Sequence, residues 1–415
     1  MRRRISRSVR GTVVESRKVL NDPRLVLWSL FLVFFPFYIA PSGLPQPADC
    51  LILILLPMLL SQWNGRLLDM TRPLRLLVIF TIYATLINVL WTLVLATFAI
   101  DLKHGFLLSP TFYIYNAIML LCVLLMYQRY RLRFIWLTVR VILVSLGLQV
   151  IVSFVVTSHA LRSSLMFNNP NQLGHYALLS ACMLMLGMQK GKLGTALVTL
   201  GLIAACYLAL MSASKAALGS IAMLGITLMF ARLRTMVLAT LVALALAFTS
   251  NPFSHALERA QQRIATDQSH GLLEERGYDR VIQYPEYWIF GSGEGDYARF
   301  ADTTVIHSHE LHSSAATLFF SYGIIGVLVF GMFLYRALRG ASARILFIVM
   351  PGFAYGMVHQ GLRFTLMWVM LGVAMALRHH DGEVRRAAAS ARKAQGAAGP
   401  SAKLVAISAS ESARS

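Results

Sequence analysis

The titratable residues best suited to acid–base chemistry form a cluster in the stretch IHSHELHSSAATLFFSYGIIG, residues 306–326. His307, His309 and His312 lie within six residues, together with Glu310. An apolar run long enough for a membrane helix follows them almost at once. Histidine changes its charge near neutral pH and is the most common general acid or base. The cluster therefore predicts a general base or an acceptor-binding group at the end of a membrane helix.

A metal site is the weaker interpretation of the same cluster. His309 and His312 are three residues apart, so the sequence HELH lacks the four-residue histidine spacing of the zinc motif H-E-x-x-H. The four cysteines all lie inside apolar runs, and no pair of them has the spacing of metal ligands. We therefore expect no metal.

Two further groups of polar residues stand at the start of apolar runs. In MFNNPNQLGHY, Asn169 can cap a helix that begins at Pro170, and Asn171 adds another amide. The amides are either a helix start alone or a ligand-binding group, because membrane helices seldom need so many. Lys215, in MSASKAALGS, is either a lysine that extends to the membrane surface or a second binding residue.

Two arginines and a glycine-rich turn lie in the stretch LLEERGYDRVIQYPEYWIFGSGEGDY. Arg276 and Arg280 are four residues apart, so they share one face if the segment is helical. They either bind an anion or pair with the acidic residues around them on a solvated face. Gly291, Gly293 and Gly295 favour a tight turn. A nucleotide-binding loop would need a strand before it and a helix after it, and we exclude that function.

The composition places these residues in a polytopic membrane protein. The chain has 415 residues, of which 57% are hydrophobic and only 13% charged, whereas soluble domains carry about a quarter charged residues. The formal net charge of +20 is spread over short clusters between apolar runs. That pattern is typical of membrane topology and not of a folded basic surface that binds nucleic acid.

Twelve apolar runs predict an all-α fold with about twelve transmembrane helices and one long loop. Lys and Arg are concentrated in every second connection and in the N-terminal segment, which places both termini in the cytoplasm. The runs are 25–41, 47–63, 73–100, 105–127, 134–156, 172–189, 193–211, 214–232, 235–250, 311–336, 343–360 and 362–378.

These runs divide the chain into five parts. The long loop holds ten of the eighteen acidic residues and five arginines, so it is net acidic and its arginines are candidates for a specific task. The tail is rich in Ala, Ser and Gly, and we expect it to be disordered. The parts are a basic cytoplasmic N-terminus (1–24), transmembrane helices one to nine (25–250), the outer loop (251–310), transmembrane helices ten to twelve (311–380) and the tail (381–415).

The topology brings the polar groups to one side of the membrane. With a cytoplasmic N-terminus, the sixth, eighth and tenth spans all begin at the outer face. Their N-terminal ends carry Asn169 and Asn171, Lys215, and the histidine cluster respectively. A helix N-terminus offers free N–H donors and a partial positive charge, and it attracts phosphate. The arrangement predicts a site for the anionic headgroup of a lipid, and a pyrophosphate fits best.

The order of four of these pieces resembles the O-antigen ligase and polymerase superfamily. The pieces are FNNPNQLG; SASK at the start of a span; an arginine and a proline (Arg276 and Pro285) before the turn GSGEG; and His312, eleven residues before GIIG. The resemblance covers about residues 160–335, and the single long loop before the histidine is most similar to that of the O-antigen ligases. In this family Arg commonly stands where the chain has Lys215, and Asn where it has Ser313.

The resemblance implies a glycosyltransferase in the bacterial inner membrane, with its active site on the periplasmic face. Such a ligase moves O-antigen polysaccharide from undecaprenyl pyrophosphate to lipid A–core oligosaccharide, without cofactor, metal or ATP. The implied catalytic residues are His312, as the base, and Arg276. Arg280, Lys215, Asn169 and Asn171 would bind the pyrophosphate, and His309 and Glu310 would support the base or bind the acceptor. The partners are then the lipid-linked donor, the lipid A–core acceptor and membrane lipids, with no nucleic acid.

Three alternatives remain open. An O-antigen polymerase uses the same donor and a second lipid-linked glycan as acceptor. A protein O-oligosaccharyltransferase of the same superfamily uses a serine on a pilin. A lipid or sugar transporter also has about twelve spans, but it is expected to carry charged or broken helices near the bilayer midplane.

Overall fold

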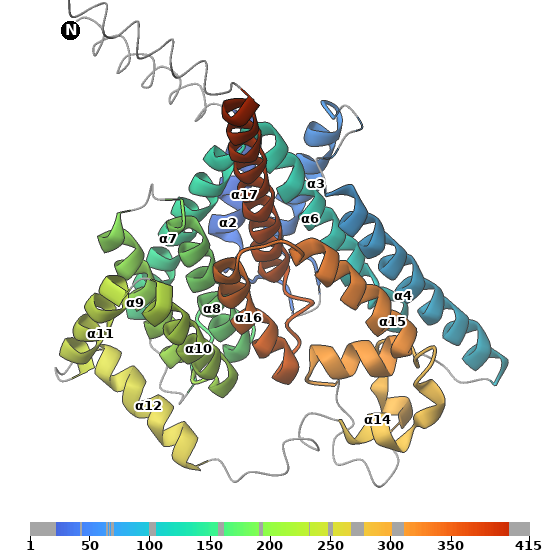
Figure 1. The fold of residues 1–415 in the computed structure, drawn as a ribbon. Helices are drawn as coiled ribbons and strands as arrows, with labels where there is room; N and C mark the ends of the chain where they lie inside the picture. The colour runs from blue at the N-terminus through green and yellow to red at the C-terminus, as the bar shows by residue number, and fades with distance from the viewer. Residues whose placement is uncertain are drawn as a thin grey trace, which may run out of the picture.

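A computed structural model describes residues 22–41, 44–63, 65, 67, 70–98, 105–156, 162–190, 194–231, 233–247, 252–266, 278–300 and 311–397. Within these residues the chain forms helices and no strand, which confirms the all-α prediction (Figure 1). The elements are α2 (Pro23–Phe34), α3 (Pro47–Leu60), α4 (Thr71–Thr97), α5 (Gly105–Leu108), α6 (Thr111–Tyr130), α7 (Leu132–Val155), α8 (Pro170–Met188), α9 (Thr195–Ser212), α10 (Lys215–Ala231), α11 (Leu233–Ala247), α12 (Pro252–Thr266), α14 (Asp279–Gln283), η1 (Pro285–Tyr287), η2 (Tyr297–Phe300), α15 (Ser314–Leu338), α16 (Ala343–Val358) and α17 (Thr365–Ala397).

Each apolar run predicted from the sequence overlaps a helix of the structure, and the run 105–127 overlaps both α5 and α6. By length and composition, five segments among the described residues can cross a membrane: Thr71–Thr97, Phe106–Tyr130, Leu132–Val155, Thr195–Ser212 and Ser314–Leu338. Other apolar helices are shorter. α2, for example, has 12 residues and is about 18 Å long, against about 30 Å for the hydrocarbon layer. Membrane-protein character is therefore supported, and twelve crossings stay a prediction.

α8 is the central helix of the bundle. It packs against α7, α9, α10, α16 and α17, and every residue from Leu173 to Met188 is buried. A helix that is buried all round belongs to the core of a large helical protein. Because α8 is held on all sides, its N-terminal end at Asn169 has a fixed position in the site described below.

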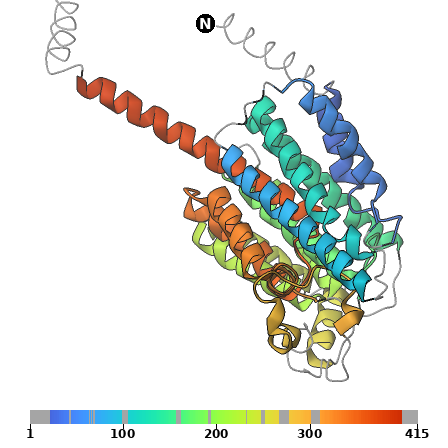
Figure 2. The same ribbon diagram turned by 90° about the vertical axis from the view of Figure 1, so that its right-hand side faces the viewer.

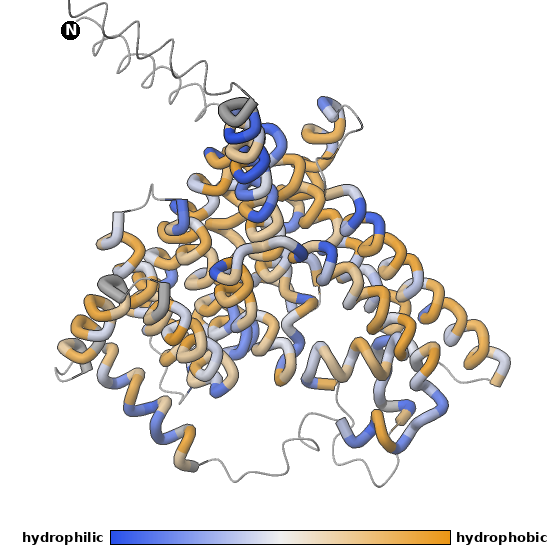
Figure 3. Tube along the Cα trace, viewed as in Figure 1, coloured by the Kyte–Doolittle hydropathy of each residue, from blue (hydrophilic) through white to orange (hydrophobic). Residues whose placement is uncertain are grey.

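The outer loop and the C-terminal helix lie on opposite sides of the bundle. In Figure 1, α12 and α14 lie at the bottom, and the end of α17 rises from the top. Figure 2 shows the same end of α17 extending away from the other helices. The helices of the bundle are mostly hydrophobic, whereas α12 alternates between hydrophilic and hydrophobic residues (Figure 3). This is the arrangement that the charge pattern predicts for the loop and the C-terminal end.

The prediction of a disordered tail from residue 381 was wrong for residues 381–397, since α17 continues to Ala397. The segment is rich in alanine and arginine, which have high helix propensity. Two ion pairs also hold its first turns to the bundle: Lys190 pairs with Asp381, and Arg131 with Glu383 at 3.3 Å. Residues 398–415 lie outside the described part of the chain.

α15 is broken at Gly323, and the turn of the outer loop fills the break. Gly323 has φ 62° and ψ −170°, so the helical hydrogen-bond ladder is interrupted there. The backbone of residues 288–293 replaces the missing bonds. Ser292 N–H donates to Phe320 O at 2.9 Å, Gly293 N–H donates to Ser321 O at 2.9 Å, and Ile324 N–H donates to Trp288 O at 2.7 Å. Unpaired backbone groups cost several kcal/mol in an apolar layer, so this pairing makes the break tolerable.

We expect Gly323→Ala to destabilise the protein and Gly331→Ala, in the same helix, to leave it as stable or more so. A Cβ at Gly323 would lie 2.2 Å from the Ile289 carbonyl oxygen, whereas a Cβ at Gly331 meets open space. The backbone conformation alone, which is essentially restricted to glycine, costs alanine roughly 1–3 kcal/mol. Thermal unfolding in detergent, followed by tryptophan fluorescence, measures the difference. Equal midpoints for the two variants would show that the break does not need glycine.

The topology makes a second prediction. A reporter that is active only in the periplasm should be active when fused at Gly271, and a cytoplasmic reporter should be active at Gly191 and at Gly340. The physical reason is the concentration of Lys and Arg in every second connection, on the side predicted to be cytoplasmic. Cytoplasmic activity at Gly271 would place the proposed site on the wrong side of the membrane.

Candidate functional site

A cavity of about 660 Å³ lies where several helix ends meet. Its wall is formed by the connection between α2 and α3, the starts of α3, α6 and α8, the residue two positions before α15, and the end of α16 with its connection to α17. Part of the wall is apolar and includes Leu44 and Leu53, which are 53% and 55% exposed. The remainder carries amides, histidines, a carboxylate and an arginine. Such a cavity suits a molecule with one apolar and one polar end.

The start of α8 contributes the amide group of the wall. Asn169 is the N-cap of α8, and its Oδ1 accepts from Gln172 N–H at 3.0 Å, with Pro170 as the first helical residue. The predicted helix cap is thus confirmed. Asn169, Asn171 and Gln172 also line the cavity. Asn171 is fixed from two sides, since its Oδ1 accepts from Arg162 Nη2 at 2.5 Å and its carbonyl accepts from the Tyr355 hydroxyl at 2.9 Å.

The start of α15 contributes His312. Ser313 is the N-cap of this helix, and its Oγ accepts from Ala316 N–H at 3.2 Å. His312, directly before the cap, is exposed and lines the same cavity as Asn169 and Asn171. Two of the three predicted helix ends, the starts of α8 and α15, are therefore brought together in one site.

The connection between α16 and α17 forms the wall beside His312 and is held against α15. The Ser314 hydroxyl donates to His359 O at 3.1 Å and accepts from Gly361 N–H at 2.8 Å. Gln360 Nε2 donates to the Thr317 hydroxyl at 2.6 Å. His359 and Gln360 line the cavity. These bonds fix the connection relative to the helix that begins after His312.

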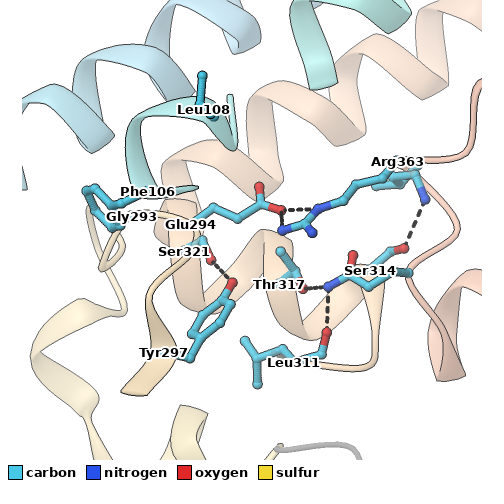
Figure 4. A network of polar contacts seen from close by, with 12 residues as sticks. Phe106, Leu108, Gly293, Glu294, Tyr297, Leu311, Ser314, Thr317, Ser321 and Arg363 are labelled. Carbon is cyan, nitrogen blue, oxygen red and sulfur yellow. Dashed lines mark hydrogen bonds and ion pairs between the residues drawn. The ribbon is translucent and has the colours of Figure 1, made fainter. Parts of the chain in front are cut away.

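Arg363, in the same connection, pairs with Glu294 of the inserted turn. Arg363 Nε donates to Glu294 Oε1 at 2.8 Å, and Nη2 lies 2.6 Å from the same oxygen. The Tyr322 hydroxyl donates to Glu294 Oε2 at 2.6 Å. Figure 4 shows the Arg363–Glu294 contacts beside the first turns of α15. The Glu294 side chain is fully buried, and that of Arg363 is 16% exposed and lines the cavity.

A carboxylate and two tyrosines belong to another part of the wall. Asp49, near the start of α3, accepts from Gln46 N–H at 2.7 Å and from the Tyr115 hydroxyl at 2.7 Å. Tyr38, Asp49 and Tyr115 all line the cavity. Both carboxylate oxygens of Asp49 therefore have a donor within the protein, and this part of the wall is fixed as well.

Arg280 lies in the core of the outer loop and is absent from the cavity wall. It is 1% exposed, and its guanidinium lies 5.8 Å from the centroid of the Tyr297 ring, beside a cluster that contains Phe300, Leu311 and Phe320. Burial lowers the pKa of the Arg280 guanidinium. In this structure Arg280 holds the loop together, and its predicted contact with pyrophosphate stays a prediction.

Arg299 is a second arginine whose contacts stabilise the loop. It donates to Ser292 O and lies 4.7 Å from the centroid of the Phe106 ring. Burial lowers its pKa to about 10. Arg299 therefore caps a carbonyl of the inserted turn and secures the turn against α5.

Lys215 begins α10, as predicted, with an exposed side chain that is not part of the cavity wall. The helix starts are close, since a Cβ on Gly174 of α8 would lie 2.9 Å from Ala217 Cβ of α10. Arg162 joins the end of α9 to the start of α8, because its Nε donates to Ser212 O at 3.3 Å while its Nη2 donates to Asn171 Oδ1. The role of Lys215 stays a prediction.

The remaining predicted residues, Arg276, His309 and Glu310, lie outside the described residues, as does His307. The three glycines of the turn were predicted correctly. Gly291, Gly293 and Gly295 have φ of 87°, 75° and 105°, which glycine adopts without strain. Among the residues that the structure describes, no three His, Cys, Asp or Glu side chains group closely enough to hold a metal ion.

Sequence reasoning missed Arg363, Glu294, Asp49 and Arg162. One signal for Arg363 was available: HQGLR is one of the predicted outer connections, where Lys and Arg are scarce, and it carries an arginine. Glu294 had no such signal, because the loop contains nine other acidic residues. Only the fold singles it out.

No protein-family model matches this sequence, and neither does any curated protein. The resemblance to the O-antigen ligase and polymerase superfamily therefore depends on the order of the motifs alone.

Proposed function

We propose that this protein is an O-antigen ligase, a membrane glycosyltransferase that moves a polysaccharide from undecaprenyl pyrophosphate to lipid A–core oligosaccharide. One observation carries the proposal: His312 and the amides at the start of α8 line a single cavity that has both apolar and polar walls. A general base, anion-binding helix ends and an apolar surface are the three requirements of this reaction.

The cavity suits the donor, which has an apolar chain and an anionic headgroup. Leu44 and Leu53 form part of the wall and are half exposed on the outside of the bundle, so the polyprenyl chain can contact them from the membrane. The pyrophosphate lies at the start of α8, where N–H donors and Asn169 and Asn171 favour an anion.

The chemistry is a single displacement at the sugar. The oxygen of an acceptor hydroxyl attacks the anomeric carbon, and His312 takes the proton of that hydroxyl. The bond between the anomeric carbon and the phosphate oxygen breaks, and undecaprenyl pyrophosphate leaves with the electron pair. Attack opposite to the leaving group inverts the anomeric centre. The bond between sugar and diphosphate in the donor is already activated, so ATP is unnecessary.

Purified protein in nanodiscs, supplied with donor and one acceptor at a time, tests the function. We expect glycan transfer to lipid A–core, with release of undecaprenyl pyrophosphate. Transfer to a second lipid-linked glycan would identify a polymerase, and transfer to a pilin serine would identify a protein O-oligosaccharyltransferase. Vesicle uptake or flipping of substrate without any transfer would favour a transporter and would overturn the proposal.

We expect His312→Ala to lower the transfer rate by about 10²–10⁴-fold, the usual contribution of a general base, with donor affinity nearly unchanged. His255→Ala is the matched control, because His255 lies on α12 with an exposed side chain and is not part of the cavity wall. Single-turnover rates and donor binding are measured for both. A His312→Ala variant with full activity would rule out this base, and His309 would be the next candidate.

We also expect transfer to survive EDTA. The expected mechanism uses a histidine as base and helix ends for the anion, so no step needs a divalent cation. Transfer rates are compared before and after chelation, and again after Mg²⁺ or Zn²⁺ is added. Loss on chelation with recovery on addition of a metal would contradict the mechanism.

A further inference from the structure

The pair formed by Glu294 and Arg363 is the most completely buried ion pair among the described residues. The Glu294 side chain is 0% exposed and that of Arg363 is 16% exposed. The donors at the carboxylate include Arg363 Nε, Arg363 Nη2 and the Tyr322 hydroxyl. The backbone of Glu294 is also held, because its N–H donates to Asn88 Oδ1 at 3.1 Å and its carbonyl accepts from Asn88 Nδ2 at 2.8 Å.

Stability alone does not explain such a pair. Taking two charges out of water costs several kcal/mol for each ion, and apolar side chains of similar volume are often as stable or more so. Ionisable residues that are buried in a membrane protein commonly belong to its functional site. The pair therefore points to a task for at least one of its members.

Arg363 is the member that reaches the cavity. Its guanidinium lies 5.1 Å from the centroid of the Phe112 ring, and both residues line the cavity with His312. Glu294 holds two of the guanidinium nitrogens against one carboxylate oxygen, which fixes the plane of the fork. A planar, fixed fork is the geometry that binds phosphate through two bonds.

The other cations near the site have different surroundings. Arg280 is buried beside the Tyr297 ring in the loop, and Arg299 is bonded to the carbonyl of Ser292. Arg162 is absent from the cavity wall and donates to Asn171, which lines it. Among the described residues, Arg363 alone combines a guanidinium with a place in the cavity wall.

We propose that Arg363 binds the diphosphate of the lipid-linked donor and that Glu294 is a positioning residue that orients Arg363 toward the cavity. Because Glu294 belongs to the turn inserted into the break of α15, docking of this turn is then required for binding of the anion. The inference rests on the proposed function, in which the donor is a polyprenyl diphosphate.

The experiment measures binding of three probes to the full chain in nanodiscs: undecaprenyl diphosphate, undecaprenyl monophosphate and undecaprenol. For Arg363→Gln we expect affinity for the diphosphate to fall roughly tenfold to a hundredfold, as for the loss of a charged hydrogen-bond pair. Affinity for undecaprenol, which carries no charge, should not change. Arg363→Lys should lie between the wild type and Arg363→Gln, because it keeps the charge and loses the fork.

Glu294→Gln tests the positioning role. It keeps the size of the side chain and removes the charge that orients Arg363, so we expect weaker diphosphate binding although Arg363 is unchanged. The matched control is Glu383→Gln, which removes the acidic partner of Arg131 at the opposite end of the bundle. This control should bind the diphosphate as the wild type does.

The exchanged double variant E294R/R363E separates positioning from mere stability. A purely structural pair would be restored by the exchange, with normal unfolding temperature and normal binding. Under our proposal the exchange leaves an acid in the cavity wall, and diphosphate binding stays weak. If this double variant does not fold, diphosphate binding by Arg363→Lys and by Tyr322→Phe tests the positioning role instead, since each is a milder change to the same contacts.

Two results overturn different statements. If the wild type does not bind undecaprenyl diphosphate, the proposed function fails. If the wild type binds it and Arg363→Gln and Glu294→Gln bind equally well, the proposed function stands and this inference fails. Wild-type affinity in the folded double variant would likewise overturn the positioning role.

Discussion

The structure depends on how the backbone N–H and C=O groups at the break of α15 obtain hydrogen-bond partners. Within an apolar layer every N–H and C=O group needs a partner, so a helix can be interrupted only where another segment supplies hydrogen bonds. Here the segment that ends in GSGEG supplies them, and α4 secures it: the Trp91 indole donates to Gly291 O at 2.8 Å, and the Tyr83 hydroxyl donates to Phe290 O at 2.9 Å. The constraint joins an outer loop to the interior of the helix bundle.

The position of the site follows from that constraint. The break at Gly323 lets the first turns of α15 run in a different direction from the rest of the helix. His312 lies two residues before these turns, and Ser314 is their first residue. Ser314 in turn holds the connection that contains His359 and Gln360. The amides of α8 meet them because α8 is packed on every side. The cavity is thus built from helix ends held by bonds to other elements, the preorganised arrangement that catalysis requires.

Local patterns predicted part of this structure. The apolar runs located the long helices, Asn169 followed by Pro170 located a helix cap, and the alternating glycines located the turn. Contacts between distant segments were beyond those patterns. Glu294 and Arg363 are 69 residues apart, and no spacing rule relates them. Arg280 illustrates the same limit, because only the fold shows that it is buried beside the Tyr297 ring. Composition alone did not predict the helix beyond residue 380, because it does not show the ion pairs that this segment forms with Lys190 and Arg131.

The arginines show why charge alone does not identify a binding residue. Arg280, Arg299 and Arg363 all belong to segments predicted to lie on the outer side of the membrane, and their formal charges are equal. Two of them stabilise the loop: Arg280 packs beside the Tyr297 ring, and Arg299 donates to the carbonyl of Ser292. The third is oriented by a buried carboxylate at a cavity wall. A guanidinium binds phosphate well when its plane is fixed before the ligand arrives, since less side-chain entropy is then lost on binding. The partner that fixes an arginine is therefore as informative about its role as the charge it carries.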